Sequence, residues 1–453
     1  MKKTLILSAL ACILFTANAQ VINSDSIRYN QYGKAVGRMP LSAENRDGVL
    51  VFESKNQDYK FWFDIRVQAD GQIFTKDTMN TIGNGVTIRR ARFATKVQVT
   101  KNWYGELDLN FANGSLALED AIIEYNFLNG LRSRVGNFKE EFSMAENASS
   151  RYLNFMERPT IVELFAPSRH LGWETVYSGK KFLAIGGIFF QEVSDDATST
   201  NVQDNNKDYG RNQGYSLDGR FIYQPFGENK DHGLHLAFAY SYRTPKTDVA
   251  ETQYGMAEYS ARALSYINRK KYMDTGLIPN IDHEQLTNIE IAGFYKGWLF
   301  QSEFIHDRTF RTSSLGTLDF GGFYVQGTCM LFGGRQVYEK EFGDFTQPDT
   351  GKKWGDVELA LRYDYANLNN KDIYGGSCEG YTAGLNFYTC KNVKFQLNYS
   401  YINQDRYANG KGKLFVGHDA TGALTKDPTK VVEPKGKGGD DFGMIGLRCE
   451  IDY

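Results

Sequence analysis

The 453-residue sequence predicts an all-β protein, a transmembrane antiparallel β-barrel of about 16 strands. Three observations predict it: apolar and polar residues alternate along the chain, short turns alternate with long loops, and the last strand ends in an aromatic residue. After the N-terminal segment, no stretch approaches the roughly 18 apolar residues that a membrane helix needs. With 52 Lys and Arg against 54 Asp and Glu, the chain has no basic excess, so nucleic acid is not an expected partner.

The N-terminus predicts a secretory signal peptide over residues 1–19. Lys2 and Lys3 precede an apolar run, and the small-residue box Ala17-Asn18-Ala19 follows it. We expect cleavage after Ala19, before Gln20. A short buried helix and a lipoprotein signal are the alternatives.

Residues 20–58 are polar and lack a clear pattern, which predicts a periplasmic N-terminal extension with one short strand at 49–54. The predicted outer-membrane barrel then spans 59–453. In its first strand Phe61, Phe63 and Ile65 share one face, and Asp64 and Arg66 share the other. Similar segments lie near 60–72, 87–100, 103–113, 117–127, 131–137, 170–178, 181–192, 215–224, 234–243, 287–296, 297–308, 320–332, 355–366, 379–390, 392–403 and 441–453.

The connections between these segments support closure into a barrel. Short turns fall near 100–102, 129–130, 178–180 and 390–392, whereas the alternate connections are long. Short turns on one side and long loops on the other are typical of outer-membrane barrels. The connection at 333–354 is longer than this rule predicts.

The C-terminal segment alternates apolar residues from Ile445 up to Tyr453, the last residue. A final strand ending in an aromatic is typical of outer-membrane barrels, where it acts as an assembly signal. The alternative is an edge strand of a secreted β-sandwich. A sandwich would expose its polar face to water, and that face here carries charges of both signs.

If the apolar faces meet lipid, the polar faces line an aqueous lumen. Arg90, Arg92, Arg132 and Arg134 come from the second and fifth strands, and the two strands between them are acidic. This segregation predicts a transverse field that would orient solutes. A hydrated wall with paired charges is the alternative.

The loop 138–169 is rich in Phe and Met for an exposed segment. We expect it to fold into the lumen and narrow the pore, because inward folding would bury these groups. Lys139, Arg151, Arg158 and Arg169 would then lie at the constriction. The alternative is an outward loop held by neighbouring loops or by partner subunits.

Several motifs in this region resemble one family. They are Arg89-Arg90-Ala91-Arg92, Gly136-Asn137-Phe138-Lys139-Glu140, Ser149-Ser150-Arg151-Tyr152-Leu153, Phe155-Met156-Glu157-Arg158, and Phe165-Ala166-Pro167 with Arg169 and Gly172. The ordered set resembles the phosphate-selective porins of the O and P type. The resemblance implies a sixteen-stranded outer-membrane barrel of Gram-negative bacteria, often a homotrimer. It also implies passive diffusion of small anions, with phosphate bound by Arg and Lys near an inward loop.

The predicted anion-binding and pore-lining residues come from two sources, the family motifs and the polar faces of the strands. Arg90, Arg92, Lys139, Arg151, Arg158 and Arg169 match motif positions, Ser149 and Ser150 could donate hydrogen bonds, and Lys96, Arg132 and Arg134 lie on the polar faces. Arginine suits phosphate because its planar fork bonds two oxygens at once. Two departures make the constriction less cationic: Glu141 replaces the family's proline, and His170 replaces an arginine.

No cofactor or catalytic group is predicted, and the four cysteines that remain after cleavage at Ala19 form no CxxC motif and support no metal site. A Cys378–Cys390 disulfide is possible, and the sequence does not decide it.

The sequence thus predicts a porin for small hydrophilic solutes, with anions such as phosphate as candidates. A non-selective general porin is the main alternative. An enzymatic barrel would need His near a nucleophile, and His306-Asp307 is its one suggestive pair. A plugged transporter and a closed structural barrel are further rivals.

Overall fold

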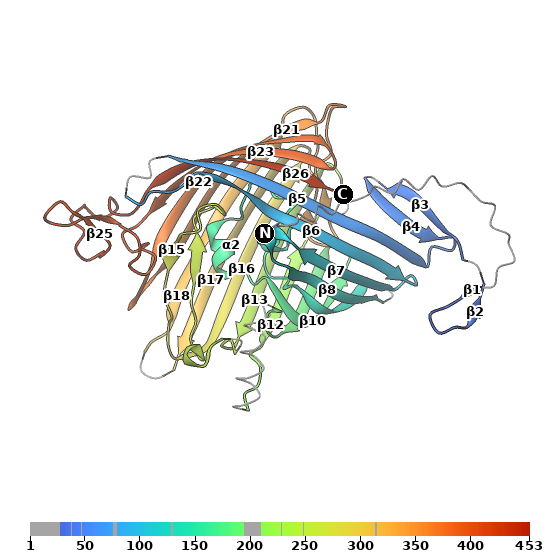
Figure 1. Cartoon of the computed structure of the whole chain (residues 1–453), viewed down its shortest axis with the longest axis horizontal. Coiled ribbons are helices and arrows are strands. Elements are labelled where there is room, and N and C mark those ends of the chain that lie inside the picture. Colours follow the sequence, from blue (N-terminus) through green and yellow to red (C-terminus); the bar gives the residue numbers. More distant parts are fainter. Residues whose placement is uncertain are drawn as a thin grey trace, which may run out of the picture.

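The computed structural model describes residues 28–453, apart from 38, 47, 76–78, 128–129, 194–209, 228, 248 and 313–314. Within these ranges sixteen strands pair antiparallel in one sheet, and the last strand pairs with the first to close a barrel (Figure 1). The barrel strands are β5 (Tyr59–Thr75), β6 (Gly85–Val99), β7 (Trp103–Asn110), β8 (Ala117–Asn126), β9 (Leu131–Lys139), β10 (Arg169–Ser178), β11 (Phe182–Phe189), β12 (Ser216–Tyr223), β13 (His232–Arg243), β16 (Ile281–Tyr295), β17 (Trp298–Arg311), β18 (Leu318–Met330), β21 (Asp356–Asn370), β22 (Ile373–Cys390), β23 (Val393–Gln404) and β26 (Phe442–Asp452).

The predicted antiparallel barrel of about 16 strands is confirmed, because each of the sixteen expected segments coincides with one barrel strand. The alternation of burial follows the pleat: on β22, Tyr381 and Leu385 face outward while Thr382 and Asn386 are buried. The C-terminal residue completes the closure. Tyr453 donates its N–H to Ile65 O, and Ile65 donates to Tyr453 O, both at 2.9 Å.

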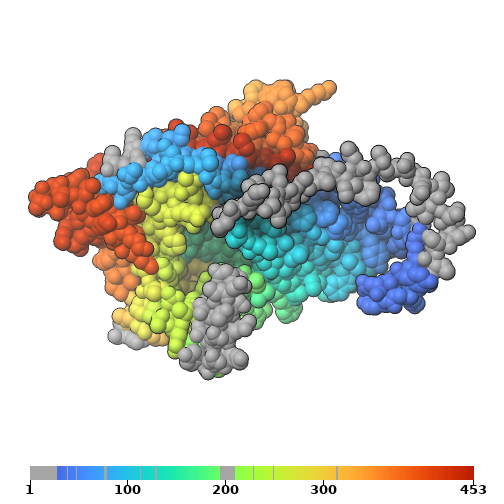
Figure 2. Space-filling view, viewed as in Figure 1, coloured from blue at the N-terminus to red at the C-terminus, as the bar shows by residue number. Residues whose placement is uncertain are grey.

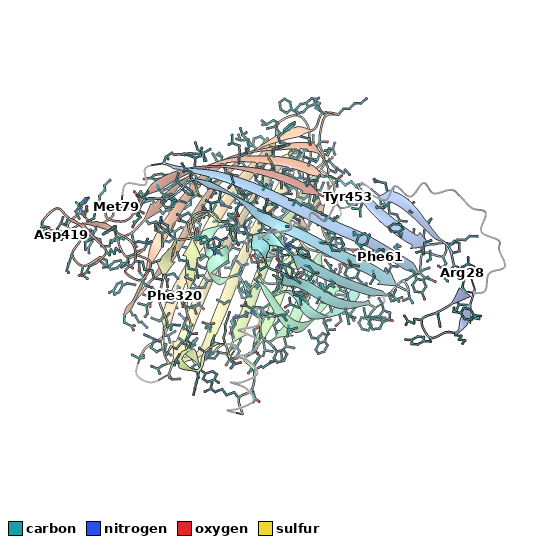
Figure 3. All side chains as sticks on the ribbon, in the orientation of Figure 1. Arg28, Phe61, Met79, Phe320, Asp419 and Tyr453 are labelled. Atoms are coloured by element: carbon teal, nitrogen blue, oxygen red, sulfur yellow. The ribbon has the colours of Figure 1, made fainter. Side chains whose placement is uncertain are left out.

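The two ends of the barrel differ in their connections. Tyr453 and Phe61 lie toward one end, and Met79 and Asp419 lie at the other (Figure 3). The turns at the Tyr453 end are mostly short, and the long connection 405–441 projects from the opposite end (Figure 2). Since long loops of such barrels are extracellular, the Tyr453 end is periplasmic.

The N-terminal residues extend the sheet past the end of β26. The hairpin of β3 (Leu41–Arg46) and β4 (Val49–Ser54) joins β5 through the pairing of Val51 with Trp62 and of Glu53 with Lys60. The strand expected at 49–54 is present as β4, and its partner β3 was not predicted. A further hairpin joins β1 (Arg28–Tyr29) to β2 (Ala35–Val36). The predicted signal peptide lies outside the described residues.

The long periplasmic connection 331–355 forms a hairpin of β19 (Tyr338–Glu339) and β20 (Asp344–Phe345). Phe345 packs with Met144, Phe294 and Leu299, so the hairpin contacts both the inward wall of β16 and β17 and the 138–169 segment. At its tip Gly343 has φ +67°, and a Cβ there would lie 2.5 Å from Ile222 Cδ1. The connection is therefore longer than the other periplasmic turns because it contains this packed hairpin.

The largest hydrophobic cluster lies on the inner side of the C-terminal strands. Ile161 and Phe165 pack with Tyr272 and Met273 of the 244–280 loop, and with inward residues of β16 to β26 such as Leu286.

The remaining short elements are η1 (Ala112–Gly114), α1 (Met144–Asn147), α2 (Thr160–Phe165), η2 (Glu251–Gln253), β14 (Ser260–Arg262), β15 (Lys271–Asp274), β24 (Gly417–His418) and β25 (Leu424–Thr425). None of the described helices has the length and apolar character to cross a membrane. Cys329, Cys378, Cys390 and Cys449 are all free thiols, so the Cys378–Cys390 disulfide is not formed.

Candidate functional site

The segment 140–168, between β9 and β10, is the centre of the candidate site. It contains two short helices. Ser143 caps α1, because its Oγ accepts the N–H of Glu146 at 3.2 Å, and α2 begins directly after Pro159. Phe142, Met144 and Phe165 are buried, which agrees with the apolar character seen in the sequence. In Figure 1, α2 is drawn within the ring of strands.

Hydrogen bonds connect this segment to buried side chains of strands far apart around the barrel. Glu303 of β17 accepts from Ser143 Oγ at 2.7 Å and from the Ala145 N–H at 2.8 Å. Asp364 of β21 accepts from the Thr160 N–H at 3.2 Å. Lys394 of β23 donates to Arg151 O at 2.6 Å. The wall fixes the segment at several points, and these carboxylates serve structure rather than solute binding.

The contact with β5 brings together serines and arginines that the sequence had suggested. Arg66 donates from Nη1 to Ser150 Oγ at 2.6 Å and from Nη2 to Ser149 Oγ at 3.2 Å. Arg90 of β6 donates to Gln68 Oε1 at 2.7 Å, and Gln68 donates to Ser150 O at 3.1 Å. Within the described residues, no carboxylate lies within salt-bridge distance of Arg66 or Arg90. Arg66 was recognised as lumenal from its face but did not stand out from the other cations.

Most of the other predicted cations are paired with carboxylates. Their partners and distances are Glu119 at 2.8 Å for Arg92, Asp64 at 2.9 Å for Lys96, Glu174 at 2.9 Å for Arg134, Glu146 at 3.6 Å for Lys139, Asp64 for Arg151, Glu146 at 3.0 Å for Arg158 and Asp120 at 2.8 Å for Arg169. Arg132 instead lies over the Phe342 ring, 4.9 Å from its centroid. Seven of the predicted cations are thus largely neutralised by carboxylates.

This pairing replaces the transverse field expected from the sequence. Lys96 lies directly opposite Glu106 in the register, and Glu124 lies opposite Arg134. Adjacent strands are only about 4.8 Å apart, so basic and acidic strands meet as cross-strand pairs. The alternative of paired charges describes this wall better.

Exposure differs between the two halves of the wall. The Arg92 and Lys96 side chains are 12% and 20% exposed, whereas Asn288 of β16 and Glu358 of β21 are fully buried. The hydrophobic cluster and the 140–168 segment cover the β16–β23 side. Solvent therefore reaches Arg92 and Lys96 of β6, whereas Arg90 of the same strand is buried.

Two carboxyl groups outside the barrel strands, Glu146 and Asp344, have pKa values shifted by burial and by neighbouring charges. Burial alone would raise the pKa of Glu146, but Arg158 and Lys139 hold it below its usual range. Burial raises the pKa of Asp344, on the β19–β20 hairpin, to about 7. Asp344 lines a cavity of about 30 Å³ together with Tyr152, Arg158 and Arg362. One group with a pKa near neutral pH thus borders the cavity beside the 140–168 segment.

An acidic cluster on β7 and β8 resembles a cation site in its geometry. Glu106, Asp108 and Asp120 place carboxylate oxygens within 4.8 Å of one another. Lys96 pairs with Glu106, Arg92 with Asp108 and Arg169 with Asp120. These cations already neutralise the cluster, so it supports no metal site.

The sequence pair His306-Asp307 is separated by the strand alternation, because Asp307 is fully buried while His306 pairs with Asp319 at 3.3 Å. Sequence reasoning missed a different buried cluster. In it, His235 contacts Glu290 at 3.0 Å and Tyr338 Oη at 2.7 Å, holding the β19–β20 hairpin.

A closed, apolar-walled barrel with a charged, partly solvated interior defines a channel protein of the outer membrane. The family model of phosphate-selective porin O and P matches residues 61–423, and the chain belongs to that family. It is an outer-membrane porin, a channel class rather than an enzyme class.

The chain is also similar to individual proteins. An uncharacterized protein of Caulobacter vibrioides is 26% identical over 347 residues, which cover 75% of this chain and 67% of that protein. Among solved structures, OmpT of Vibrio cholerae in its trimer form has a TM-score of 0.52 at 11% identity, covering 87% of this chain and 99% of that one. An anion-selective porin from Comamonas acidovorans has a TM-score of 0.51 at 9% identity, covering 87% and 100%. At such identities the structural likeness concerns the fold.

Proposed function

We propose that this porin passes small hydrophilic solutes by passive diffusion along the charged wall of β5–β10, and that it holds oxyanions such as phosphate in transit. The 140–168 segment acts as an inward-folded constriction. The oxyanion site consists of Arg66, Arg90, Ser149 and Ser150. Membership of the phosphate-selective porin family and the likeness to an anion-selective porin of Comamonas acidovorans agree with a preference for anions.

The observation that carries this proposal is the pair of buried guanidinium groups without a carboxylate partner. An unpaired buried charge is unfavourable, so a passing anion would be attracted to it. Arg66 Nε is buried without a hydrogen-bond partner, and the hydroxyl hydrogens of Ser149 and Ser150 are free to point toward an anion. The two guanidinium groups and the two hydroxyl groups can together donate hydrogen bonds to several oxygens of one phosphate.

A bilayer recording tests the proposal. We would reconstitute the mature chain in a planar bilayer, read the reversal potential under a KCl gradient, and then add phosphate. We expect anion-selective conductance that phosphate blocks, and R66Q and R90Q should each weaken the block by roughly tenfold, the effect of losing one charge-assisted hydrogen bond. R308Q, which removes an exposed outward arginine of β17, is the matched control and should change nothing.

A non-selective general porin is the second candidate, because seven of the predicted cations have carboxylate partners. Unselective or cation-selective conductance without phosphate block would favour it. No conductance at all would contradict both channel proposals. We further propose a homotrimer in outer-membrane lipid, for which native mass spectrometry should give three chains per particle.

A further inference from the structure

A broad, open groove lies on the outer wall of the barrel, across β17, β18, β21, β22 and β23. Its volume is about 510 Å³. Its floor consists of Gly327 and Ala383, which lie on either side of Leu361 in one cross-strand row that runs from Phe300 to Tyr399. At Gly327 an added Cβ would come no closer than 3.7 Å to another residue, so the hollow there is open. The groove is distinct from the proposed solute path, because it lies on the outward face of these strands, whereas the path follows the inward face of β5–β10.

The outward-pointing side chains of the groove are apolar or tyrosine. Leu361 is 58% exposed and Phe300 is 46% exposed, so large apolar surfaces face outward. Water in such a hollow would form few hydrogen bonds with its walls. In an outer-membrane protein this wall faces lipid, and the groove requires an apolar filler.

The extracellular end of the groove is polar. Glu379 Oε2 accepts from Tyr381 Oη at 3.1 Å and from Asn403 Nδ2 at 3.2 Å, and Tyr363 Oη lies 3.4 Å from Oε1. Tyrosines at this height are typical of the membrane–water boundary. The groove thus has an apolar length and a hydrogen-bonding end, the two parts of an amphiphile.

We propose that this groove binds one acyl chain of an outer-membrane lipid, whose polar head lies at the Glu379 cluster in the outer leaflet. A methylene chain is narrow enough to lie between rows of outward side chains. A second barrel, in contrast, would bring its own rows of side chains and would cover the Glu379 carboxylate with apolar surface, which is unfavourable. This binding site is separate from the proposed pore function.

The test uses substitutions that fill the groove on the outer wall and leave the residues of the lumen unchanged. G327L places a side chain in the floor, and G219L is the matched control, because Gly219 is also an outward barrel glycine whose Cβ would meet nothing closer than 3.9 Å. Each protein is purified in detergent, exchanged against phosphatidylethanolamine vesicles or vesicles containing lipid A, re-extracted, and examined by native mass spectrometry. Heat-modifiable gel migration confirms folding, and A383F is a second groove variant.

We expect the wild type and G219L to retain about one lipid per chain, because one pocket of this size would bind one lipid. G327L and A383F should lose most of the bound lipid. The vesicle type that supplies the lipid identifies its head group. Equal retention in all folded variants would overturn the proposal. Dissociation of the trimer by G327L with unchanged lipid would make the groove a subunit contact instead. Channel conductance measured in parallel tests the pore proposal independently.

Discussion

At the scale of single residues, charge pairing separates the cations of this lumen into two classes. Arg169 donates from Nε and Nη2 to Asp120 at 2.8 Å and pairs with Glu119 at 2.8 Å, whereas Arg90 has only the Gln68 amide. The first class neutralises acidic neighbours, and the second has no carboxylate within salt-bridge distance among the described residues. Removing a member of each class should therefore have different effects.

We expect R169Q to shift the reversal potential in a KCl gradient toward cation selectivity, because Glu119 and Asp120 would lose their main cation. The permeability ratio should change roughly two- to fivefold, as a free-energy change of up to about 1 kcal/mol would give. The double variant R169Q/D120N restores much of the local balance and should return toward the wild-type value. If R169Q alone leaves selectivity unchanged, this pair does not border the conducting path.

Asp344 should make selectivity depend on pH. Burial raises its pKa to about 7, so it is mostly neutral at pH 6 and mostly charged at pH 8. Raising the pH adds negative charge beside the cavity that Arg158 and Arg362 line, and anion selectivity should therefore fall. The measurement is the reversal potential in KCl across this range, without phosphate, which itself titrates there. D344N should flatten the profile, and an unchanged profile in D344N would assign the titration to another group.

The sequence predicted which face each charged residue would occupy, but not its partner. Strand periodicity alone places Arg66, Arg90 and Arg92 inward. Whether a cation is free depends on register across strands and on the path of residues 140–168, and neither follows from periodicity. Arg66 and Arg90 therefore stood out only when the structure showed that no carboxylate of the described residues lies within salt-bridge distance of either.

At the scale of elements, the sequence predicted the barrel strands but not the β19–β20 hairpin. All sixteen barrel strands were predicted, since each must alternate apolar and polar residues between lipid and lumen. The β19–β20 hairpin has only two residues per strand and no periodicity to detect. Its one sequence signal was the aromatic content of an overlong turn, with Tyr338, Phe342 and Phe345.

Phe345 should determine whether this hairpin stays packed. Burying its ring against Met144 and Phe294 holds the hairpin on the 140–168 segment, and F345A should destabilise that contact by about 3–5 kcal/mol. We expect the hairpin to detach while the barrel stays folded, and the single-channel conductance to rise. F332A, which removes an exposed ring from the same connection, is the control and should leave conductance unchanged.

An F345A channel with wild-type conductance would contradict this role, provided that gel migration confirms the folded barrel. It would mean that the hairpin lies beside the conducting path and does not narrow it. A channel with higher conductance and altered selectivity would instead place both Asp344 and Phe345 at the narrowest part.

At the scale of the whole molecule, the interior is divided between packing and permeation. The cluster of Ile161, Phe165, Tyr272 and Met273 fills the side of the C-terminal strands with apolar side chains. The partly exposed charges lie on the opposite side. One barrel thus contains both a hydrophobic core, which fixes the inward loops, and a hydrated wall, which suits the passage of solutes.

The N-terminal extension should be separable from this barrel. Only three residues of β4, Val51 to Glu53, pair with β5, whereas ten residues of β26 pair with it. A mature chain that begins at residue 55 keeps all sixteen barrel strands and the hydrogen bonds between Tyr453 and Ile65. We expect it to fold, to show heat-modifiable migration, and to conduct like the full mature chain.

Deleting Ile451–Tyr453 is the informative comparison for that truncation. It removes the last pairs of β26, Ile451 with Val67 and Asp452 with Arg66, together with both Tyr453 hydrogen bonds. An unpaired edge of β5 would then face lipid, where each unsatisfied backbone group costs several kcal/mol, so this variant should fail to assemble. If the N-terminal truncation failed and the C-terminal deletion assembled, closure would depend on β4, and the barrel domain would begin before residue 59.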